Sequence, residues 1–336
     1  MYSFERRDSC PSCASELQDV LARTKFKSDQ LWPVVALQCN APEGSLGEQD
    51  YEAVQCPVCS TIYQSWVGNE ELLADLYGEW ISDELTDREK VRFAWLTDNP
   101  KLSRDAHDLM TAAAILKTPL SELKTLDYGM GLGLWAEISG KLGCASYGFD
   151  YSKSRTELAA MKGIRTTTLA EIDGANFDFI NLEQVMEHVT DTDTTMTLIQ
   201  SGLRPGGLLR ISVPGQNALR SALKKLGSGT SPSASEIDPL SPLQHVNAFT
   251  SKGLRELGRR FGVIPISQFY AQRFAFLLKG GISVRYPIDG AKELLRPLLP
   301  LENRRNLTVW FRKPFRARKN PRSRCNTLSP HEERTL

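Results

Sequence analysis

The stretch LDYGMGLGLWAEI, residues 126–138, constrains the fold more than any other part of the sequence. It begins in an apolar run that ends at Asp127, and glycines then stand at positions 129, 131 and 133. Glycine is costly inside regular structure, so three of them within five residues predict a turn whose main chain lies close to a ligand. The next residues, LWAEISGKL, have the character of a helix. The stretch therefore predicts a strand, a ligand-binding turn and a helix.

The residues after position 122 alternate between β-prone runs and helical segments. In order they are LKTLDYG, LWAEISGKLG, ASYGFDYS, RTELAAMKG, IRTTTLAE, NFDFINLEQV, MTLIQSGLRPGG and LLRISVPG. This alternation predicts an α/β fold with a doubly wound, mostly parallel sheet, and such sheets bind ligands at the carboxyl ends of their strands. Two later runs, VIPISQFYAQ and NLTVWFRK, predict further strands at the sheet edge.

Four of the seven cysteines form two C-x-x-C pairs, which are Cys10 with Cys13 and Cys56 with Cys59. Four thiolates in two tight turns are what tetrahedral Zn²⁺ requires, and such a closed set predicts a structural zinc rather than a catalytic one. A redox function is the alternative, but no thioredoxin-like βαβ pattern lies near either pair. We interpret Cys39 as a buried apolar thiol, with a substitute zinc ligand as the alternative.

Composition divides the chain into four parts. Residues 1–70 are predicted to form the zinc-ribbon module, 71–121 a helical connector, 122–312 the α/β domain and 313–336 a basic, disordered tail. Within the α/β domain, residues 214–245 are rich in Gly, Ser and Pro and predict a loop that can act as a lid. For the tail, contact with RNA or anionic lipid is the alternative to a solvated terminus.

The overall charge balance and hydropathy exclude some classes of protein. Lys plus Arg number 41 and Asp plus Glu number 40, so no net field recruits nucleic acid or an anionic membrane surface. No apolar run approaches the roughly 20 residues of a membrane helix, and the amino terminus lacks the apolar core of a signal peptide. We therefore expect a cytoplasmic protein without a membrane span.

Two kinds of ligand fit the glycine turn. Gly131 to Ala136 reads G-x-G-x-x-A, which suits the pyrophosphate of a dinucleotide, although a carboxylate at Asp127 would repel it. The same stretch resembles the D-x-G-x-G-x-G signature of class I methyltransferases, with Asp127, Gly129, Gly131 and Gly133 in register. The resemblance implies S-adenosylmethionine as cofactor, its methionine part lying on the glycines and its amino group held by Asp127.

Further segments resemble the same family in the expected order. These are YGFDYS, NFDFINLEQVMEHV, LRPGGLLRISVP and QHVNAFTSKGLRELGRRFGV, and the last is similar to a segment of the branch that carries an N-terminal zinc ribbon. A carboxylate at Asp150 can accept hydrogen bonds from both ribose hydroxyls. The resemblance covers most of residues 1–270. It implies a cofactor site made of Asp127, Gly129, Gly131, Gly133, Asp150, Tyr151, Glu183 and Gln184.

Methyl transfer from a sulfonium is an in-line displacement, so the protein must position the acceptor, an oxygen, nitrogen or carbon atom, and remove a proton where that acceptor is protonated. The catalytic candidates are His245, His188 and Glu183. His245 is the better base because it adjoins the predicted lid, whereas His188 has the alternative of bonding a backbone carbonyl. We interpret Glu187 as a surface or capping carboxylate. Tyr128 and Trp135 are core aromatics by default, with contact to the cofactor as the alternative.

The leading hypothesis is a methyltransferase that acts on a small molecule, with a sugar or saccharide-type intermediate suggested by the ribbon-bearing relatives. A second hypothesis directs the enzyme to RNA through the ribbon and the basic tail, although the first 70 residues are not notably basic. A third is a non-catalytic scaffold that binds S-adenosylmethionine. A nicotinamide oxidoreductase is disfavoured by Asp127 and by the later motifs.

Overall fold

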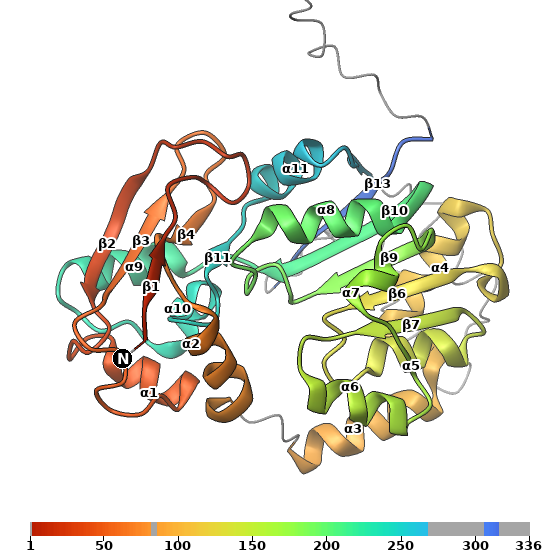
Figure 1. The fold of residues 1–336 in the computed structure, drawn as a ribbon, viewed down its shortest axis with the longest axis horizontal. Helices are drawn as coiled ribbons and strands as arrows, with labels where there is room; N and C mark the ends of the chain where they lie inside the picture. Colours follow the sequence, from red (N-terminus) through yellow and green to blue (C-terminus); the bar gives the residue numbers. More distant parts are fainter. Residues whose placement is uncertain (1, 82–85, 268–305, 316–336) are drawn as a thin grey trace, which may run out of the picture.

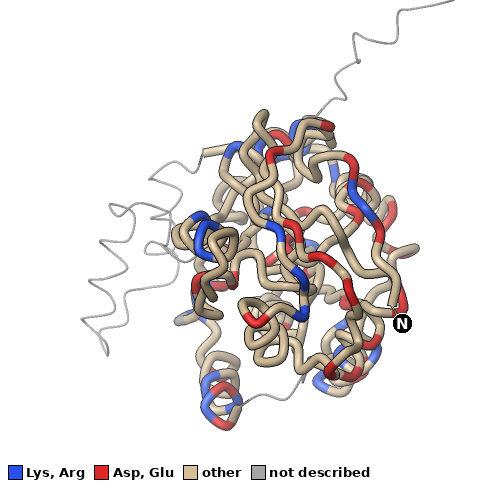
Figure 2. The backbone as a smooth tube through the Cα atoms, turned by 90° about the vertical axis from the view of Figure 1, so that its left-hand side faces the viewer, with Lys and Arg blue, Asp and Glu red and all other residues tan. Residues whose placement is uncertain are grey.

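The computed structural model describes residues 2–81, 86–267 and 306–315, which form two units side by side (Figure 1). The smaller unit holds the N-terminal strands, and the larger one holds a wide sheet covered by helices. Cys325 and the predicted tail beyond Phe315 lie outside the described residues. Basic and acidic residues are interspersed along the backbone in Figure 2, in keeping with the balanced composition.

The larger unit contains a seven-stranded sheet of order β12-β13-β10-β9-β6-β7-β8. Strands β6, β7, β8, β9 and β10 pair in parallel, and β13 is antiparallel to both of its neighbours. This confirms the predicted doubly wound, mostly parallel α/β fold. The strands are β6 (Lys124–Tyr128), β7 (Ala145–Phe149), β8 (Arg165–Thr166), β9 (Phe177–Glu183), β10 (Leu203–Pro214), β12 (Ile264–Ile266) and β13 (Asn306–Arg312).

The two late strands occupy different places in this sheet. β12 forms its edge, as predicted, whereas β13 lies between β10 and β12. The edge prediction is therefore wrong for β13. Val309, Trp310 and Phe311 are all buried, so the strand carries apolar side chains on both faces and belongs to the interior of the sheet. From Gln268 on, the run VIPISQFYAQ lies outside the described residues.

Helices cover both faces of the sheet. The α4 face is packed by α4 (Arg104–Leu116) and α5 (Leu134–Lys141), and the opposite face by α8 (Thr192–Gly202) and α11 (Ser251–Arg260). Side chains alternate between the faces along β10, so Leu209 and Ile211 point to the core under α8 and α11, while Leu208 and Arg210 point to α4. The remaining helices of this unit are α3 (Asp87–Asp98), α6 (Lys153–Met161) and α7 (Leu169–Ile172).

The smaller unit is built on a four-stranded antiparallel sheet of order β11-β4-β3-β2 and a separate pair, β1 with β5. Its elements are β1 (Phe4–Arg6), β2 (Asp19–Lys25), α1 (Trp32–Cys39), β3 (Asp50–Gln55), β4 (Ile62–Gln64), β5 (Trp66–Gly68), α2 (Glu70–Asp75) and a π-helical turn (Leu76–Trp80). The edge strand β11 (Asn247–Ala248) comes from far along the chain, so the two units share a strand-forming segment.

The segment 214–245 is not the loop that its composition predicts. It forms α9 (Leu219–Gly227), α10 (Ala234–Ile237) and a 3₁₀ turn (Asp238–Leu240). Its apolar side chains belong to the core of the smaller unit: Leu219, Ala222, Leu223, Leu226, Ile237 and Leu240. The correction has a physical basis, because LRSALKKLG places apolar residues at positions i, i+3, i+4 and i+7, which is one face of a helix. None of the helices in the described ranges is long and apolar enough to cross a bilayer.

Candidate functional site

The glycine turn follows β6 and has left-handed backbone at all three glycines. φ is +74° at Gly129, +54° at Gly131 and +80° at Gly133. A Cβ atom at Gly129 would lie 2.5 Å from Val185, and one at Gly133 would lie 2.5 Å from Ile164, whereas one at Gly131 would meet no atom within 4 Å. The outer glycines are thus required by packing. The middle one leaves the main chain open at the carboxyl end of the sheet, where a ligand can lie against it.

Asp150, at the end of β7, is fastened to this turn. Its Oδ2 accepts a hydrogen bond from the Gly131 amide at 2.8 Å, and its Oδ1 accepts one from the Ser152 amide at 2.9 Å. Each oxygen keeps a second lone pair for a ligand hydroxyl. The next residue, Tyr151, is 71% exposed, and its hydroxyl lies 3.0 Å from that of Tyr128. The predicted roles of Asp150 and Tyr151 toward a cofactor stay predictions.

Asp127 is buried beneath the turn, with 4% of its surface exposed. Its Oδ1 accepts a hydrogen bond of 3.0 Å from Nδ2 of Asn181. Burial raises the pKa of Asp127 to about 7, the Asn181 hydrogen bond opposes this shift, and the nearby carboxylates of Asp105 and Glu183 add to it. A cation bound here would favour the ionised carboxylate.

Asp127 belongs to a polar row across three strands that the sequence reasoning missed. Register places Asp127 beside Asn181 and Asn181 beside Arg210, which is 2% exposed. Arg210 donates from Nη1 to Oδ1 of Asn181 at 2.8 Å and to the Glu183 carboxylate. The guanidinium thereby fixes the amide so that its NH₂ group points to Asp127. Only the strand register could have revealed this row.

The helix α4 adds two carboxylates to the same row. Oδ2 of Asp108 lies 3.0 Å from Nε of Arg210, and burial together with Asp108 raises the pKa of Asp105 to about 6. Asp108 and Glu183 thus pair with the guanidinium, and the carboxyl groups of Asp105 and Asp127 lie near enough to interact with it electrostatically. The excess of negative charge near the carboxyl ends of the strands suits a cationic ligand.

Gln184 and the two aromatic residues near the glycine turn have structural contacts. Gln184 has φ of +56°, and both its backbone N and its side-chain Nε2 donate to the Ser212 carbonyl, at 2.8 and 3.3 Å. It therefore ties the end of β9 to β10. Trp135 is 7% exposed and packs edge-on against Phe179, and Tyr128 is 1% exposed, so both occupy the core as expected.

His188 and His245 meet at the junction of the two units, although they stand 57 positions apart in the sequence. Their ring centroids lie 4.6 Å apart in an edge-to-face arrangement. Nδ1 of His188 lies 3.0 Å from the Tyr77 hydroxyl and 3.1 Å from the Gln244 carbonyl, and Nδ1 of His245 contacts the Asp238 carbonyl. Burial lowers the pKa of His188 to about 3 and lowers that of His245 below its ordinary value, so both rings are neutral at pH 7.

Glu187 contradicts the interpretation as a surface or capping carboxylate. Its side chain has no exposed area, and neither carboxylate oxygen has a hydrogen-bond partner among the described residues. Burial raises its pKa well above the ordinary value. Nothing in the local sequence indicated this burial, because a charged residue in a loop is exposed by default. The third catalytic candidate, Glu183, lies in the Arg210 row rather than beside the histidines.

Asn247 holds the Glu187 segment in place. Its backbone N donates to the Glu187 carbonyl at 3.0 Å, and its Nδ2 donates to the carbonyls of Met186 and Val189 at 3.0 and 2.7 Å. Its Oδ1 in turn accepts from Arg7 at 2.7 Å. Because Asn247 also forms strand β11, it links the sheet of the smaller unit to the loop after β9.

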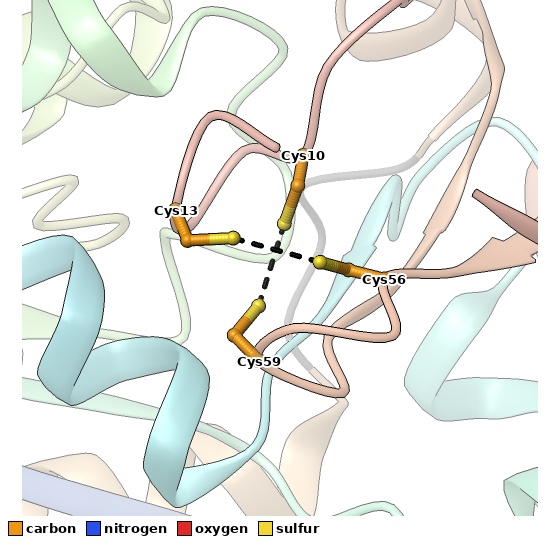
Figure 3. Close-up of side chains that lie close together, drawn as sticks. All are labelled: Cys10, Cys13, Cys56 and Cys59. Atoms are coloured by element: carbon orange, nitrogen blue, oxygen red, sulfur yellow. Dashed lines mark hydrogen bonds between the residues drawn. The ribbon is translucent and has the colours of Figure 1, made fainter. Parts of the chain in front are cut away.

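The four predicted zinc ligands converge in the smaller unit (Figure 3). Their sulfur atoms all lie within 4.8 Å of one another, with Sγ–Sγ distances of 3.5 Å for Cys10 to Cys59 and for Cys13 to Cys56. None of them forms a disulfide. Cys39 lies elsewhere in the same unit, buried in the apolar core with Sγ 3.3 Å from the Pro242 carbonyl.

Both cysteine turns dock on the larger unit through their carbonyls. Thr192 Oγ1 donates to the Pro11 carbonyl at 2.9 Å, and Arg260 Nη1 donates to that of Ser12 at 3.1 Å. Thr250 Oγ1 donates to the Cys59 carbonyl at 2.8 Å. The donors belong to the starts of α8 and α11 and to the end of α11, so the cysteine turns define how the two units pack.

A sheet of this order, with a glycine turn and buried carboxylates at its carboxyl end, defines a Rossmann-like domain that binds a cationic or nucleoside-type cofactor. Comparison with known proteins narrows this class. The methyltransferase-domain family known as Methyltransf_23 matches residues 97–268, just over half of the chain. The chain belongs to this family, and the class I methyltransferase fold predicted from the glycine-rich stretch is confirmed.

Individual relatives match shorter parts of the sequence. The chain is 36% identical over 118 residues to a ubiquinone biosynthesis O-methyltransferase of Bradyrhizobium sp. (strain ORS 278), which covers 32% of this chain and 47% of that protein. Another such O-methyltransferase, from Brucella melitensis biotype 2 (strain ATCC 23457), is 35% identical over 104 residues, covering 28% and 42%. The chain thus spans about half the length of these relatives.

Solved structures show a more distant likeness. The plantazolicin methyltransferase BamL, in complex with a triazolic desmethylPZN analog and SAH, shares 16% identity, with a TM-score of 0.43 over 67% of this chain and 91% of that one. For the 1,6-didemethyltoxoflavin-N1-methyltransferase of Burkholderia thailandensis the identity is 19% and the TM-score 0.35, over 70% and 93%.

Proposed function

We propose that the protein transfers a methyl group from S-adenosylmethionine to a hydroxyl oxygen of a small molecule. The observation that carries this proposal is the placement of two sets of groups at one end of the sheet. The carboxylate row lies on β6, β9 and β10 and the open glycine turn follows β6, while His188 follows β9 by a few residues and packs against His245. Sulfonium donor and acceptor can therefore meet at the carboxyl ends of the strands.

The residues present fit the cofactor. Asp127 and its row supply excess negative charge for an ammonium group, and the main chain at Gly131 is open to a ligand. Asp150 keeps lone pairs for ribose hydroxyls, and Tyr151, Glu183 and Gln184 border the same region. When bound, S-adenosylmethionine supplies an electrophilic methyl group on a positively charged sulfur. Asp127, held by Asn181, would orient its amino group, and no acid is needed for the leaving group.

The acceptor proton is the remaining task. The Asp238 carbonyl can only accept a hydrogen bond, so Nδ1 of His245 carries the hydrogen and Nε2 presents a lone pair. Both histidines are partly buried, and Nδ1 of His188 lies between the Gln244 carbonyl and the Tyr77 hydroxyl. His245 Nε2 would take the proton of the acceptor hydroxyl as the hydroxyl oxygen is methylated. His188 positions the ring of His245.

An oxygen acceptor is favoured by the relatives, which are named as O-methyltransferases. The match covers less than half of those proteins, so the acceptor of this chain is argued from its own site. A neutral imidazole beside a fully buried carboxyl group suits an uncharged hydroxyl more than an anionic substrate. A sugar or saccharide-type hydroxyl compound is one member of this class. The cytoplasmic location expected from the sequence stays a prediction.

We also propose that the four cysteines bind a structural Zn²⁺. Bond lengths of about 2.3 Å in a tetrahedron put sulfur atoms roughly 3.7 Å apart. The Sγ–Sγ distances of 3.5 Å lie close to that value. The donor set is closed, so the ion would hold the two turns that dock on α8 and α11 and would take no part in methyl transfer.

Ligand binding tests the cofactor assignment. Purified protein is heated with S-adenosylmethionine, S-adenosylhomocysteine or NAD(H), beside the variants Asp150→Ala and, as a control at the opposite end of the sheet, Glu122→Gln. A ligand at 100 times its dissociation constant adds about 2.7 kcal/mol to the free energy of unfolding. We expect only the adenosyl ligands to raise the Tm, and Asp150→Ala to lose the shift. Stabilisation by NAD(H) alone would refute the proposal.

Turnover tests the acceptor class. Transfer of a labelled methyl group is measured with a panel of phenols, catechols and sugar hydroxyl compounds, with simple amines as the contrast. We expect product from a hydroxyl compound and a 10²- to 10⁴-fold lower rate for His245→Ala, the usual effect of losing a general base. Methylation of amines alone would contradict the oxygen assignment.

A further inference from the structure

We propose that Glu187, His188 and His245 bind one divalent transition-metal ion at the junction of the two units, separate from the cysteine cluster. One ligand atom from each of these residues lies within 4.8 Å of the others. A role of this ion in activating the acceptor rests on the function proposed above. Binding of the ion is independent of that function and can be measured without turnover.

The hydrogen bonds of the two imidazoles involve Nδ1 and leave Nε2 of each ring free to bind a metal ion. The carbonyls of Gln244 and Asp238 can only accept, so Nδ1–H of His188 donates to the first and Nδ1–H of His245 to the second. Each Nε2 then carries a lone pair. Metal-binding histidines in proteins usually donate their other ring N–H to a carbonyl or carboxylate in this way, which fixes the tautomer and the ring orientation.

Glu187 supplies the independent observation that points to a cation. Its side chain has no exposed area, and both carboxylate oxygens lack a hydrogen-bond partner among the described residues. A buried carboxyl group without partners costs free energy, and a cation bound to the carboxylate would offset that cost. The side chain lies within reach of the two imidazoles, so it completes a set of two histidines and one carboxylate.

The surroundings hold these ligands firmly from both units. Asn247 donates hydrogen bonds to the carbonyls of Glu187, Met186 and Val189. Gln244 donates from Nε2 to the Gln38 carbonyl at 2.8 Å. Tyr77, from the smaller unit, packs edge-on against His188. The site therefore requires the packed junction.

Two imidazoles and a carboxylate favour a first-row transition ion such as Zn²⁺, Fe²⁺ or Mn²⁺ over Mg²⁺ or Ca²⁺. Bonds of about 2.0 to 2.2 Å bring adjacent ligands to roughly 3 to 4 Å, so the three side chains must close slightly around the ion. Three protein ligands leave positions open, and an acceptor hydroxyl bound there would lose its proton more readily. Because the ion would occupy the His245 lone pair, the proton of a metal-bound hydroxyl would pass to solvent water, and proton transfer to His245 would describe the ion-free protein.

Titration with Mn²⁺, followed by the loss of the free-ion EPR signal, tests the site. Mn²⁺ suits oxygen and nitrogen ligands and is a poor match for thiolates, so the protein is first given one equivalent of Zn²⁺ per chain, which the four thiolates bind in preference, and no free Zn²⁺ is left. We expect one bound Mn²⁺ per chain, released by added Zn²⁺ because Zn²⁺ binds such sites more tightly. Glu187→Gln and His245→Gln should each weaken Mn²⁺ binding at least 10-fold, and the control Glu122→Gln should leave it unchanged.

The outcomes separate this inference from the proposed function. No uptake of Mn²⁺ by the wild-type protein, or equal uptake by a folded Glu187→Gln variant, would overturn the metal site. Should Glu187→Gln fail to fold, the partly exposed His245 decides through His245→Gln. If the protein binds S-adenosylhomocysteine but takes up no Mn²⁺, the proposed methyltransferase function stands and the metal site is refuted. If it takes up Mn²⁺ but does not bind S-adenosylhomocysteine, the metal site stands and the proposed function is refuted.

Discussion

The pKa of Asp127 makes cofactor binding depend on pH in a way that can be calculated. Burial raises this pKa to about 7 in the free protein. A ligand ammonium group bound to the ionised carboxylate lowers it, so binding below pH 7 must first remove a proton. About 90% of Asp127 is ionised at pH 8 and about 1% at pH 5. The dissociation constant of S-adenosylhomocysteine should therefore rise roughly 100-fold, about 2.7 kcal/mol, over this interval.

Calorimetric titration of S-adenosylhomocysteine at pH 8, 7, 6 and 5 measures this dependence, because the ligand amine stays protonated throughout. Asp127→Asn should bind weakly at every pH and show a much flatter profile. Asp105, whose pKa is about 6, contributes below that pH, so Asp105→Asn is titrated in parallel. A wild-type dissociation constant that stays constant from pH 8 to pH 5 would refute the assignment of the ammonium site to Asp127.

The same pKa has a consequence for stability, with the opposite sign. The folded value of about 7 exceeds the ordinary value of 3.8, so the folded state binds the proton more tightly. Ionisation of Asp127 therefore does not lower the free energy of unfolding below about pH 4. The loss grows as the pH rises to about 7, where it reaches on the order of 4 kcal/mol. Asp127→Asn should accordingly raise the Tm of the ligand-free protein at pH 8 more than at pH 4.

Three other changes probe the turn, the cysteine cluster and the junction. Gly133→Ala places a Cβ against Ile164 at a positive φ and should cost about 1–3 kcal/mol in the free energy of unfolding by urea titration, with normal stability refuting the packing role. Cys13→Ser should lower the zinc content and the Tm and expose the first cysteine turn to protease, because that turn docks on Thr192 and Arg260; a metal-replete, protease-resistant variant would contradict this. Asn247→Ala leaves buried carbonyls unsatisfied and should destabilise the protein by about 2–4 kcal/mol, and unchanged unfolding would show that β11 does not hold the junction.

Several features followed from local sequence alone. Positive φ at the three glycines is a property that few other residues tolerate, and it marked the turn after β6. The period of the apolar residues gave the order of strands and helices in the α/β domain, and Thr250 caps α11 as its residue type suggests. The two C-x-x-C pairs predicted the cysteine cluster, because each such turn directs its two sulfur atoms toward one point.

Other features required the tertiary structure. The polar row from Asp127 to Arg210 exists only because parallel strands align residues that stand 54 and 29 positions apart in the sequence. The segment 214–245 packs on the smaller unit because the apolar face of its helix contacts the apolar core there. Its loop-like composition did not indicate these contacts. Glu187 is buried for the same kind of reason: the loop that bears it is covered by the strand β11 and by the packed smaller unit. Local chemistry thus determined the cofactor turn and the cysteine cluster. Burial and contacts between distant segments were decided by how the two units pack, because the exposure of a side chain depends on the folded surface and not on the sequence near it.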